Sequence, residues 1–203
     1  MTLGTLYIIS APSGAGKTSL VKQLISQLTE LTVSISHTTR PIRSGEIDGQ
    51  DYYFVSVAEF QTMLDKKAFL EHAQVFDNFY GTAQDTVERN LRQGLDVILE
   101  IDWQGARQIK ALLPDSISIF ILPPSIAMLQ QRLTGRGQDD ETVIARRMRD
   151  AVAEMRHCNE FDYVIVNDVF EQALTELTHI IMAHRLTQQR QQLVLQPLLA
   201  TLL

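Results

Sequence analysis

The stretch that decides the fold is Ala11-Pro12-Ser13-Gly14-Ala15-Gly16-Lys17-Thr18, with Ser19 directly after it. It fits the phosphate-binding loop pattern, except that Ala11 stands where a first glycine is usual. In such a loop, backbone N–H groups and the start of the following helix surround an anion, while Lys17 brings a positive charge to the β and γ phosphates. Thr18 supplies a hydroxyl that can ligate magnesium. The stretch therefore predicts binding of ATP or GTP.

The sequence on either side gives this loop its structural context. The apolar run Leu6–Ser10 predicts a strand before the loop, and Thr18–Leu28 has the spacing of a helix after it. Further strands are predicted at Leu31–Ile35, Asp96–Ile101, Ile117–Leu122 and Tyr163–Val166. Helical patterns lie between them at Thr86–Arg92, Gln104–Leu112, Ser125–Thr134 and Phe170–Gln192. This alternation predicts a three-layer α/β fold with a central parallel sheet and ligands at the carboxyl ends of its strands.

Two stretches interrupt the alternation within what we expect to be one domain over residues 1–203. Residues 37–83 are polar and rich in turns, with a capping box of Ser56 and Glu59 that predicts a helix from Val57, so they form a small mixed α/β insert. Residues 124–157 are rich in arginine around a glycine-flanked turn and predict a helical lid. The core is then residues 1–36, 84–123 and 158–203.

Composition limits the partners and the compartment. The formal net charge of -6 argues against nucleic-acid binding through a basic surface. The single cysteine, Cys158, cannot form an internal disulfide, and residues 1–16 lack the pattern of a secretory signal, so we expect a cytoplasmic protein. No apolar run approaches the ~20 residues of a membrane helix. The apolar end at residues 193–203 either packs on the chain's own sheet, which we favour, or makes the protein a homo-oligomer.

Glu100 is the candidate for a second magnesium contact. It ends the predicted strand Asp96–Ile101, and Asp102 lies two positions further on the same strand face. A carboxylate at a strand end is ordinarily solvated, but beside a phosphate loop it can hold magnesium, directly or through water. His37, His72 and Cys158 lack the spacing of zinc ligands and are interpreted as structural residues.

Six segments in order along nearly the whole chain resemble the guanylate kinases. They are SAPSGAGKTSL, SHTTRPIRSGEIDGQDYYF, FLEHAQVFDNFYGT, ILEIDWQGARQI, RLTGRGQDDETVIARRM and FDYVIVND. Enzymes of that family move the γ-phosphoryl group of ATP onto GMP, giving ADP and GDP, with Mg²⁺. The resemblance implies the same activity here, in purine nucleotide metabolism, with dGMP as a further acceptor.

The resemblance also implies a set of GMP-binding residues. They are Ser36, Arg40, Arg43, Tyr52, Glu71, Tyr80, Thr82 and Asp102. A carboxylate such as Glu71 accepts hydrogen bonds from both donors on the Watson–Crick edge of guanine, which would contribute ~1 to 3 kcal/mol of base discrimination. Arg40 and Arg43 would hold the phosphate. Without the resemblance, Glu71 would be interpreted as a surface carboxylate and the arginines as a solvated pair.

In the family, arginines of the lid reach the transferring phosphoryl group. The matching catalytic residues are Lys17 with Arg132, Arg136 and Arg147, and Asn167 would lie beside the adenine. Many relatives carry aspartate at the position of Glu100, which leaves its contact with magnesium open. Arg146 and Arg147 point about 100° apart on a helix, so either could face the phosphates.

Two alternatives to a GMP kinase remain open from the sequence. One is a phosphate-loop kinase for another small acceptor. The other is a non-catalytic guanylate-kinase-like module that binds phosphorylated peptides. Glu71 and the two arginines argue against the first, while Lys17 and Thr18 argue against the second.

Overall fold

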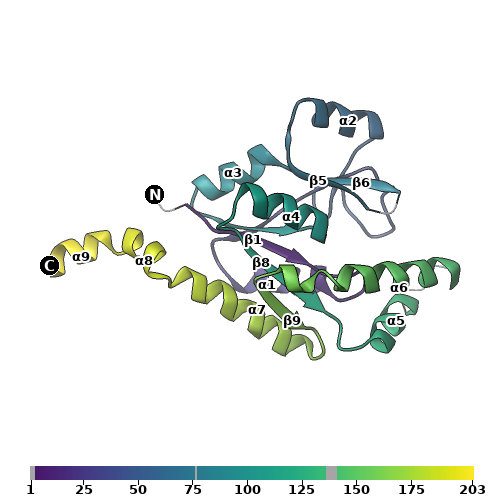
Figure 1. The fold of residues 1–203 in the computed structure, drawn as a ribbon. Helices are drawn as coiled ribbons and strands as arrows, with labels where there is room; N and C mark the ends of the chain where they lie inside the picture. The colour runs from purple at the N-terminus through teal and green to yellow at the C-terminus, as the bar shows by residue number, and fades with distance from the viewer. Residues whose placement is uncertain (1–2, 76, 136–140) are drawn as a thin grey trace.

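A five-stranded parallel sheet forms the centre of the molecule (Figure 1). The computed structural model describes residues 3–75, 77–135 and 141–203. In spatial order the strands are β2 (Leu31–Ser34), β7 (Asp96–Glu100), β1 (Leu6–Ser10), β8 (Ile117–Leu122) and β9 (Tyr163–Val166). All neighbouring pairs run parallel. The five predicted strands are confirmed, with β2 and β7 each ending one residue earlier than expected.

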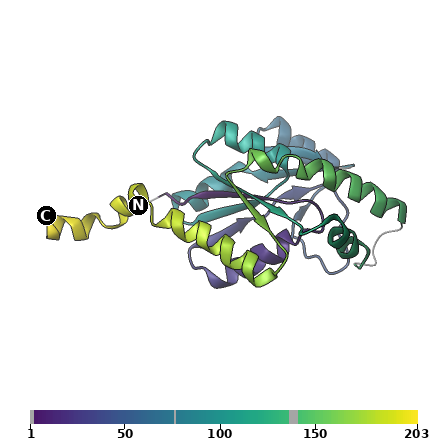
Figure 2. The same cartoon turned by 60° about the horizontal axis from the view of Figure 1, so that its bottom comes forward.

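Helices cover both faces of this sheet and make three layers (Figure 2). On one face lie α1 (Lys17–Gln27) and α7 (Phe170–Arg185), and on the other α3 (Gln84–Arg92) and α4 (Trp103–Leu112). Tyr7 and Ile9 of β1 pack into the first cluster, while Leu6 and Ile8 pack into the second. Successive side chains of a strand point to opposite faces, so an uninterrupted apolar strand is buried on both. The three-layer α/β prediction is confirmed.

The insert has a second sheet of its own, in the order β4-β3-β6-β5. Its elements are β3 (His37–Thr38), β4 (Tyr53–Phe54), α2 (Val57–Asp65), β5 (Phe69–Val75) and β6 (Asn78–Ala83). The predicted capping box is confirmed, because Glu59 N donates to Ser56 Oγ at 3.2 Å and Ser56 N donates to Glu59 Oε2 at 2.7 Å. Phe60, 1% exposed, attaches α2 to this sheet by stacking on Phe69 and Phe79.

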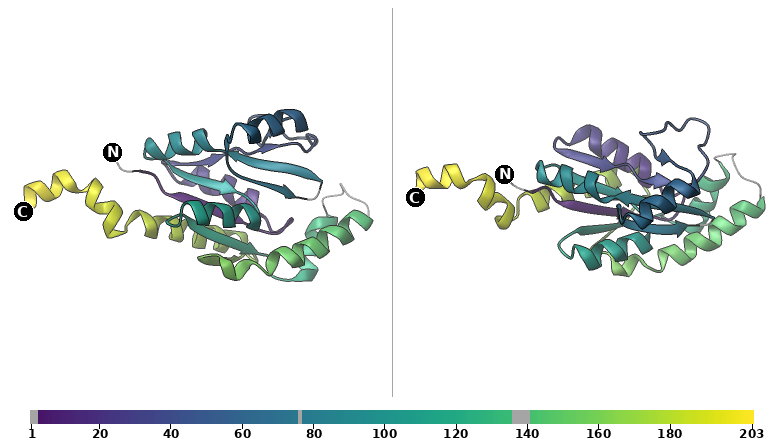
Figure 3. Two further views of the ribbon diagram at one scale, coloured as in Figure 1. Left: turned by 45° about the horizontal axis from the view of Figure 1, so that its top comes forward. Right: turned by 90° about the horizontal axis from the view of Figure 1, so that it is seen from above.

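Two helices follow β8 where the sequence predicts a lid. They are α5 (Ile126–Thr134) and α6 (Glu141–Met155), and a short 3-10 helix η1 (Cys158–Glu160) follows them. Leu129 and Leu133 of α5 pack against Ala151 of α6, so the two helices share a small core apart from the sheet. Figure 3 shows α6 and the insert at the same end of the molecule, away from the C-terminus. The assignment of residues 124–157 as a lid stays a prediction.

The long helix predicted over Phe170–Gln192 is wrong in its second part, because α7 ends at Arg185 and α8 (Gln188–Val194) begins after a break. Arg185 Nε donates to Asp96 Oδ2 at 2.8 Å, and Arg190 Nη1 donates to Asp96 Oδ1 at 2.6 Å. Asp96 is fully buried and also accepts from Thr5 N at 2.8 Å. Two arginines on either side of the break thus reach one carboxylate at the amino end of β7.

The C-terminal helices project from the body instead of packing on the sheet. Helices α8 and α9 (Gln196–Leu202) run outward in every ribbon view, away from α6 and the insert (Figures 1 and 3). From Val194 onwards their large apolar side chains are exposed, with Leu198 at 51% and Leu202 at 68%. The expectation that residues 193–203 pack on the chain's own sheet is therefore wrong. No helix in the described ranges is long and apolar enough to cross a membrane.

Candidate active site

The phosphate loop joins the carboxyl end of β1 to the first turn of α1. Gly14 has φ 92° and Gly16 has φ 94°, a left-handed conformation that residues with a Cβ rarely adopt. A Cβ on Gly16 would lie 2.4 Å from Asn167 Nδ2, so the position also leaves no space for a side chain. The conformation of residues 11–16 directs the backbone and the start of α1 at Lys17 towards one cavity.

Asn167 and Arg132 brace this loop from the side of β9 and α5. Asn167 Nδ2 donates to the Ala15 carbonyl at 2.7 Å, and Arg132 Nη2 donates to the Asn167 carbonyl at 2.9 Å. Together with Gly14, Gly16 and Phe170 they line a shallow pocket on the outer side of the loop. Arg132 therefore lies beside the loop rather than across it. Arg136, also predicted to be catalytic, lies outside the described residues.

The two predicted metal ligands meet. Thr18 Oγ1 donates to Glu100 Oε2 at 2.9 Å, which brings the first turn of α1 to the end of β7. A hydroxyl and a carboxylate are hard oxygen donors of the kind that Mg²⁺ prefers, and Mg²⁺ usually completes its shell with water and substrate phosphates. In residues 3–75, 77–135 and 141–203, no three His, Cys, Asp or Glu side chains gather as a metal cluster. The donor set thus fits Mg²⁺ held jointly with a nucleotide.

Glu71 on β5 is a buried carboxylate, 3% exposed, at the far end of the same cavity. Burial raises its pKa to about 7, and Asp102 adds to the rise, while Thr82 and Lys17 oppose it. Thr82 Oγ1 donates to Glu71 Oε1 at 2.6 Å, and Ser36 Oγ lies 3.4 Å from Thr82 Oγ1. Three predicted GMP residues therefore form one buried group. Gly105 is a fourth neighbour that no pattern in the sequence predicts, and a Cβ there would lie 2.5 Å from Glu71 Oε2.

Asp102 lies beside Glu71 but has a structural role of its own. Its Oδ1 accepts from Gly105 N at 2.9 Å and makes Asp102 the N-cap of α4, while Oδ2 accepts from Gln104 Nε2 at 3.0 Å. One side chain thus fixes the start of α4 and faces the cavity. If Asp102 also contacts guanine, it does so with a carboxylate that already accepts the N-cap hydrogen bond of α4.

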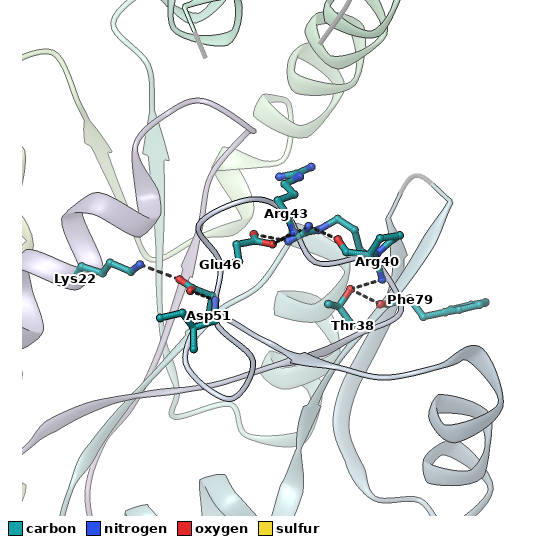
Figure 4. Close-up of polar contacts among 9 residues, drawn as sticks. Lys22, Thr38, Arg40, Arg43, Glu46, Asp51 and Phe79 are labelled. Carbon is teal, nitrogen blue, oxygen red and sulfur yellow. Dashed lines mark hydrogen bonds and ion pairs between the residues drawn. The ribbon is translucent and has the colours of Figure 1, made fainter. Parts of the chain in front are cut away.

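Arg40 and Arg43, the predicted phosphate clamp, are arranged around a glutamate that sequence reasoning missed. Glu46 accepts two hydrogen bonds from Arg40, at 2.7 and 3.0 Å, and one from Arg43 N at 2.8 Å. In Figure 4 the Arg43 guanidinium points away from the Arg40–Glu46 pair. The same figure shows Lys22 bonded to Asp51 at 2.9 Å, a second missed pair that links α1 to the insert.

Two tyrosines complete the polar lining on the insert side. The rings of Tyr52 and Tyr80 lie edge to face at 5.9 Å between centroids. Burial, Tyr80 and Glu100 raise the pKa of Tyr52 to about 12, so its hydroxyl stays protonated at neutral pH and can donate to a phosphate.

The cavities bring most of the predicted residues to one place. A cavity of about 270 Å³ is lined by the loop, Glu71, Glu100 and Asp102. A wider one of about 700 Å³ adjoins it, and its walls include Arg40, Arg43, Tyr80, Arg146 and Arg147. Both include Ser13, Thr18, Ser36 and Tyr52. Their combined size suits a small ligand on either side of Thr18.

The lid helix also contacts the insert directly. Arg146 Nη1 lies 3.4 Å from Asp77 Oδ2, between β5 and β6, and Arg146 Nε lies 3.9 Å from Asp150 Oδ2. Arg146 and Arg147 both line the wide cavity, so the choice between them as the phosphate-facing arginine stays open. The Asp77 contact could not be predicted, because it joins residues 69 positions apart.

Comparison with known proteins gives a consistent result over the whole chain. The guanylate kinase family model matches residues 3–184. The chain is 59% identical to the guanylate kinase of Methylococcus capsulatus over 203 residues, with full coverage of both chains. It is 58% identical to that of Saccharophagus degradans, with 98% of each covered. The crystal structure of guanylate kinase from Anaplasma phagocytophilum has a TM-score of 0.79 and 34% identity, covering 94% of this chain and 90% of that one.

Proposed function

The chain belongs to the guanylate kinase family, and from this membership we propose which role each site residue has in the transfer of the γ-phosphoryl group of ATP to GMP. The activity is an ATP:GMP phosphotransfer that yields ADP and GDP. The observation that supports this assignment is that a buried carboxylate, Glu71, and the lysine of the loop, Lys17, line one cavity. The two substrates would then meet end to end at the loop.

ATP would bind with its phosphates on the loop of residues 11–19. The backbone N–H groups of residues 14–18 and the charge of Lys17 would hold the β and γ phosphates. Thr18 and Glu100 would hold Mg²⁺, which when bound neutralises phosphate charge. Asn167 and Arg132, beside the outer pocket, would flank the rest of ATP, with Asn167 next to the adenine.

GMP would bind with its base at Glu71 and its phosphate towards the tyrosines. Ionised Glu71 would accept hydrogen bonds from guanine N1–H and from the exocyclic amine. Thr82, Ser36 and Asp102 would lie beside the base as further polar contacts. Adenine has an acceptor where guanine has N1–H, so Glu71 would find no donor there. Tyr52, Tyr80, Arg40 and Arg43 would hold the phosphate, with Glu46 setting the position of Arg40.

Phosphoryl transfer passes through a loose transition state, so positioning and charge neutralisation account for most of the acceleration. An oxygen of the GMP phosphate attacks the γ phosphorus while the bond to the ADP oxygen breaks. Lys17, with Arg132, Arg136 and Arg147, would stabilise the charge that develops there. Approach of the lid would also exclude water, which competes with GMP as acceptor. No general base is assigned.

We further propose that the chain has three functional parts, and that each of the two sheets belongs to a different part. Residues 37–83 would be the GMP-binding insert, residues 124–157 the lid and the remainder the ATP-binding core. The net charge of -6 supports small-molecule substrates rather than nucleic acid. The reaction is expected in the cytoplasm, with dGMP as a further acceptor.

An acceptor panel tests the proposed function. Purified chain with Mg-ATP is assayed for ADP release with GMP, dGMP, AMP, CMP or UMP. GMP should be turned over much faster than AMP, CMP or UMP, because only guanine offers Glu71 two donors. The Lys17→Ala variant serves as the matched blank and should lose at least ~100-fold in turnover. Equal or absent turnover with all five acceptors would refute the assignment.

A further inference from the structure

Glu154 is a carboxylate in the active-site cavity to which the proposed reaction gives no role. It lies in the last turn of α6, and its side chain is partly buried. The cavity that it lines also contains Ser13, Gly14 and Lys17 of the phosphate loop. An acidic side chain of the lid helix therefore lies in the space towards which the loop directs its phosphate-binding groups.

The electrostatic surroundings of Glu154 connect it to the same groups that bind phosphate. Burial raises its pKa to about 7, and the carboxylates of Asp102 and Asp150 add to the rise. Lys17 and the backbone N–H of Ser13 act in the opposite direction and favour its ionised form. The positive field of the loop thus acts on a carboxylate as it would on a phosphate oxygen.

We propose that Glu154 is a positioning residue that competes with ATP phosphate for the positive charge of Lys17 in their shared cavity, so that ATP binding displaces the end of α6. The proposal rests on the ATP site given under the proposed function. A phosphate and a carboxylate repel each other when they share one cationic site. Helix α6 also carries Arg147, seven residues before Glu154, so displacement of Glu154 moves an arginine of the proposed transfer site.

The chain contains its own reporter at this end of α6. Trp103 is the only tryptophan, and its ring stacks on His157 with centroids 3.8 Å apart and planes at 10°. His157 lies two residues beyond the end of α6, and Arg107 covers the Trp103 ring at 4.6 Å. Movement of the end of α6 changes this stack and therefore the fluorescence of Trp103.

The test is an ATP titration without GMP, followed by Trp103 fluorescence and calorimetry, on the wild type and the Glu154→Gln and Asp115→Asn variants. Glu154→Gln keeps the shape and removes the charge, so ATP should bind about fivefold more tightly, at the low end of coupling energies between sites. The fluorescence change on ATP binding should fall, and KM for ATP should fall while KM for GMP is unchanged. Asp115→Asn removes a charge from an exposed side chain that lines neither cavity of the site, and should behave as the wild type.

If Glu154→Gln binds ATP no more tightly than the wild type and shows the same fluorescence change, the inference is overturned. If both proteins still phosphorylate GMP in that case, the proposed function stands. Absence of GMP turnover in the wild type would overturn the function itself. If Glu154→Gln fails to fold, Glu154→Asp takes its place. It withdraws the carboxylate from Lys17 by one methylene, so ATP affinity should again rise.

Discussion

At the scale of single residues, Glu71 makes the reaction sensitive to pH. Its pKa is raised to about 7, and only its ionised form accepts both guanine donors. Between pH 6 and pH 8 the ionised fraction rises about tenfold, so the ratio of kcat/KM for GMP to that for AMP should rise by about the same factor. AMP is the reference because its phosphate titrates as that of GMP does. A ratio that does not change with pH would mean that another group recognises the base.

The Glu71→Gln variant is the control for this pH effect. Its amide offers guanine a donor where an acceptor is needed, so kcat/KM should fall for GMP and not for AMP, and the pH dependence of the ratio should vanish. The raised pKa also affects folding, since protonated Glu71 is the form that the buried site favours. Its stabilising contribution is complete below the ordinary pKa of 4.5 and is lost as the pH rises through about 7.

At the scale of elements, Asp96 joins the end of α7 and the start of α8 to the central sheet through Arg185 and Arg190. Arg185→Met removes one partner of a carboxylate that is fully buried, and the unfolding free energy should fall by about 3 kcal/mol. Arg92→Met is the matched control, because Arg92 pairs with Glu88 on the surface and its side chain is 70% exposed. Urea unfolding of both variants measures the difference, and equal losses would contradict a special role for the Asp96 pair.

The elements that could be predicted are those with a local signal. Apolar runs specify β1, β7 and β8, and Ser56 with Glu59 specifies the start of α2, since each pattern is contained within a few residues. The end of α7 could not be predicted from local spacing, and its last residue, Arg185, bonds to Asp96, 89 positions earlier. Helical periodicity continues across that break and hides it.

The residues of the candidate site also fall into those that a local pattern predicts and those that it does not. The loop of residues 11–18 and its helix follow from local spacing, and the burial of Glu71 agrees with the role that family resemblance implies for it. Asp51, Asp77 and Glu154 have no local signal, because their partners come from other segments of the chain. Glu46 has its partners within six residues, but no spacing pattern predicts that its side chain turns back to Arg40. Such contacts become visible only when the fold brings insert, loop and lid together.

At the scale of the whole molecule, the projecting helices α8 and α9 are the surface through which we propose that two copies associate. Their exposed apolar residues are Val194, Leu195, Leu198, Leu199, Leu202 and Leu203. Residues 191–203 contain no charged side chain, so a matching uncharged helix is a suitable partner, and pairing of identical surfaces makes a closed dimer.

A chain ending at Val194 keeps Arg190 and its bond to Asp96, and should fold normally. It should elute as a monomer in size-exclusion chromatography with light scattering, while the full chain elutes at a higher mass. Its kcat/KM for GMP should change less than about twofold, because α9 lies away from the site. Leu112→Ser, at an exposed leucine of α4, is the control and should keep the higher mass. Equal masses for the full and shortened chains would exclude α9 as the contact.

The position of Leu203 has a practical consequence for immobilising the enzyme. The C-terminus lies at the tip of α9, on the far side of the body from the insert and α6 (Figure 3). A chemical tether at this point holds the enzyme on a bead or an electrode with its nucleotide sites facing the bulk solution. The helices between tether and body then act as a built-in spacer, so substrates reach an anchored molecule without an added linker.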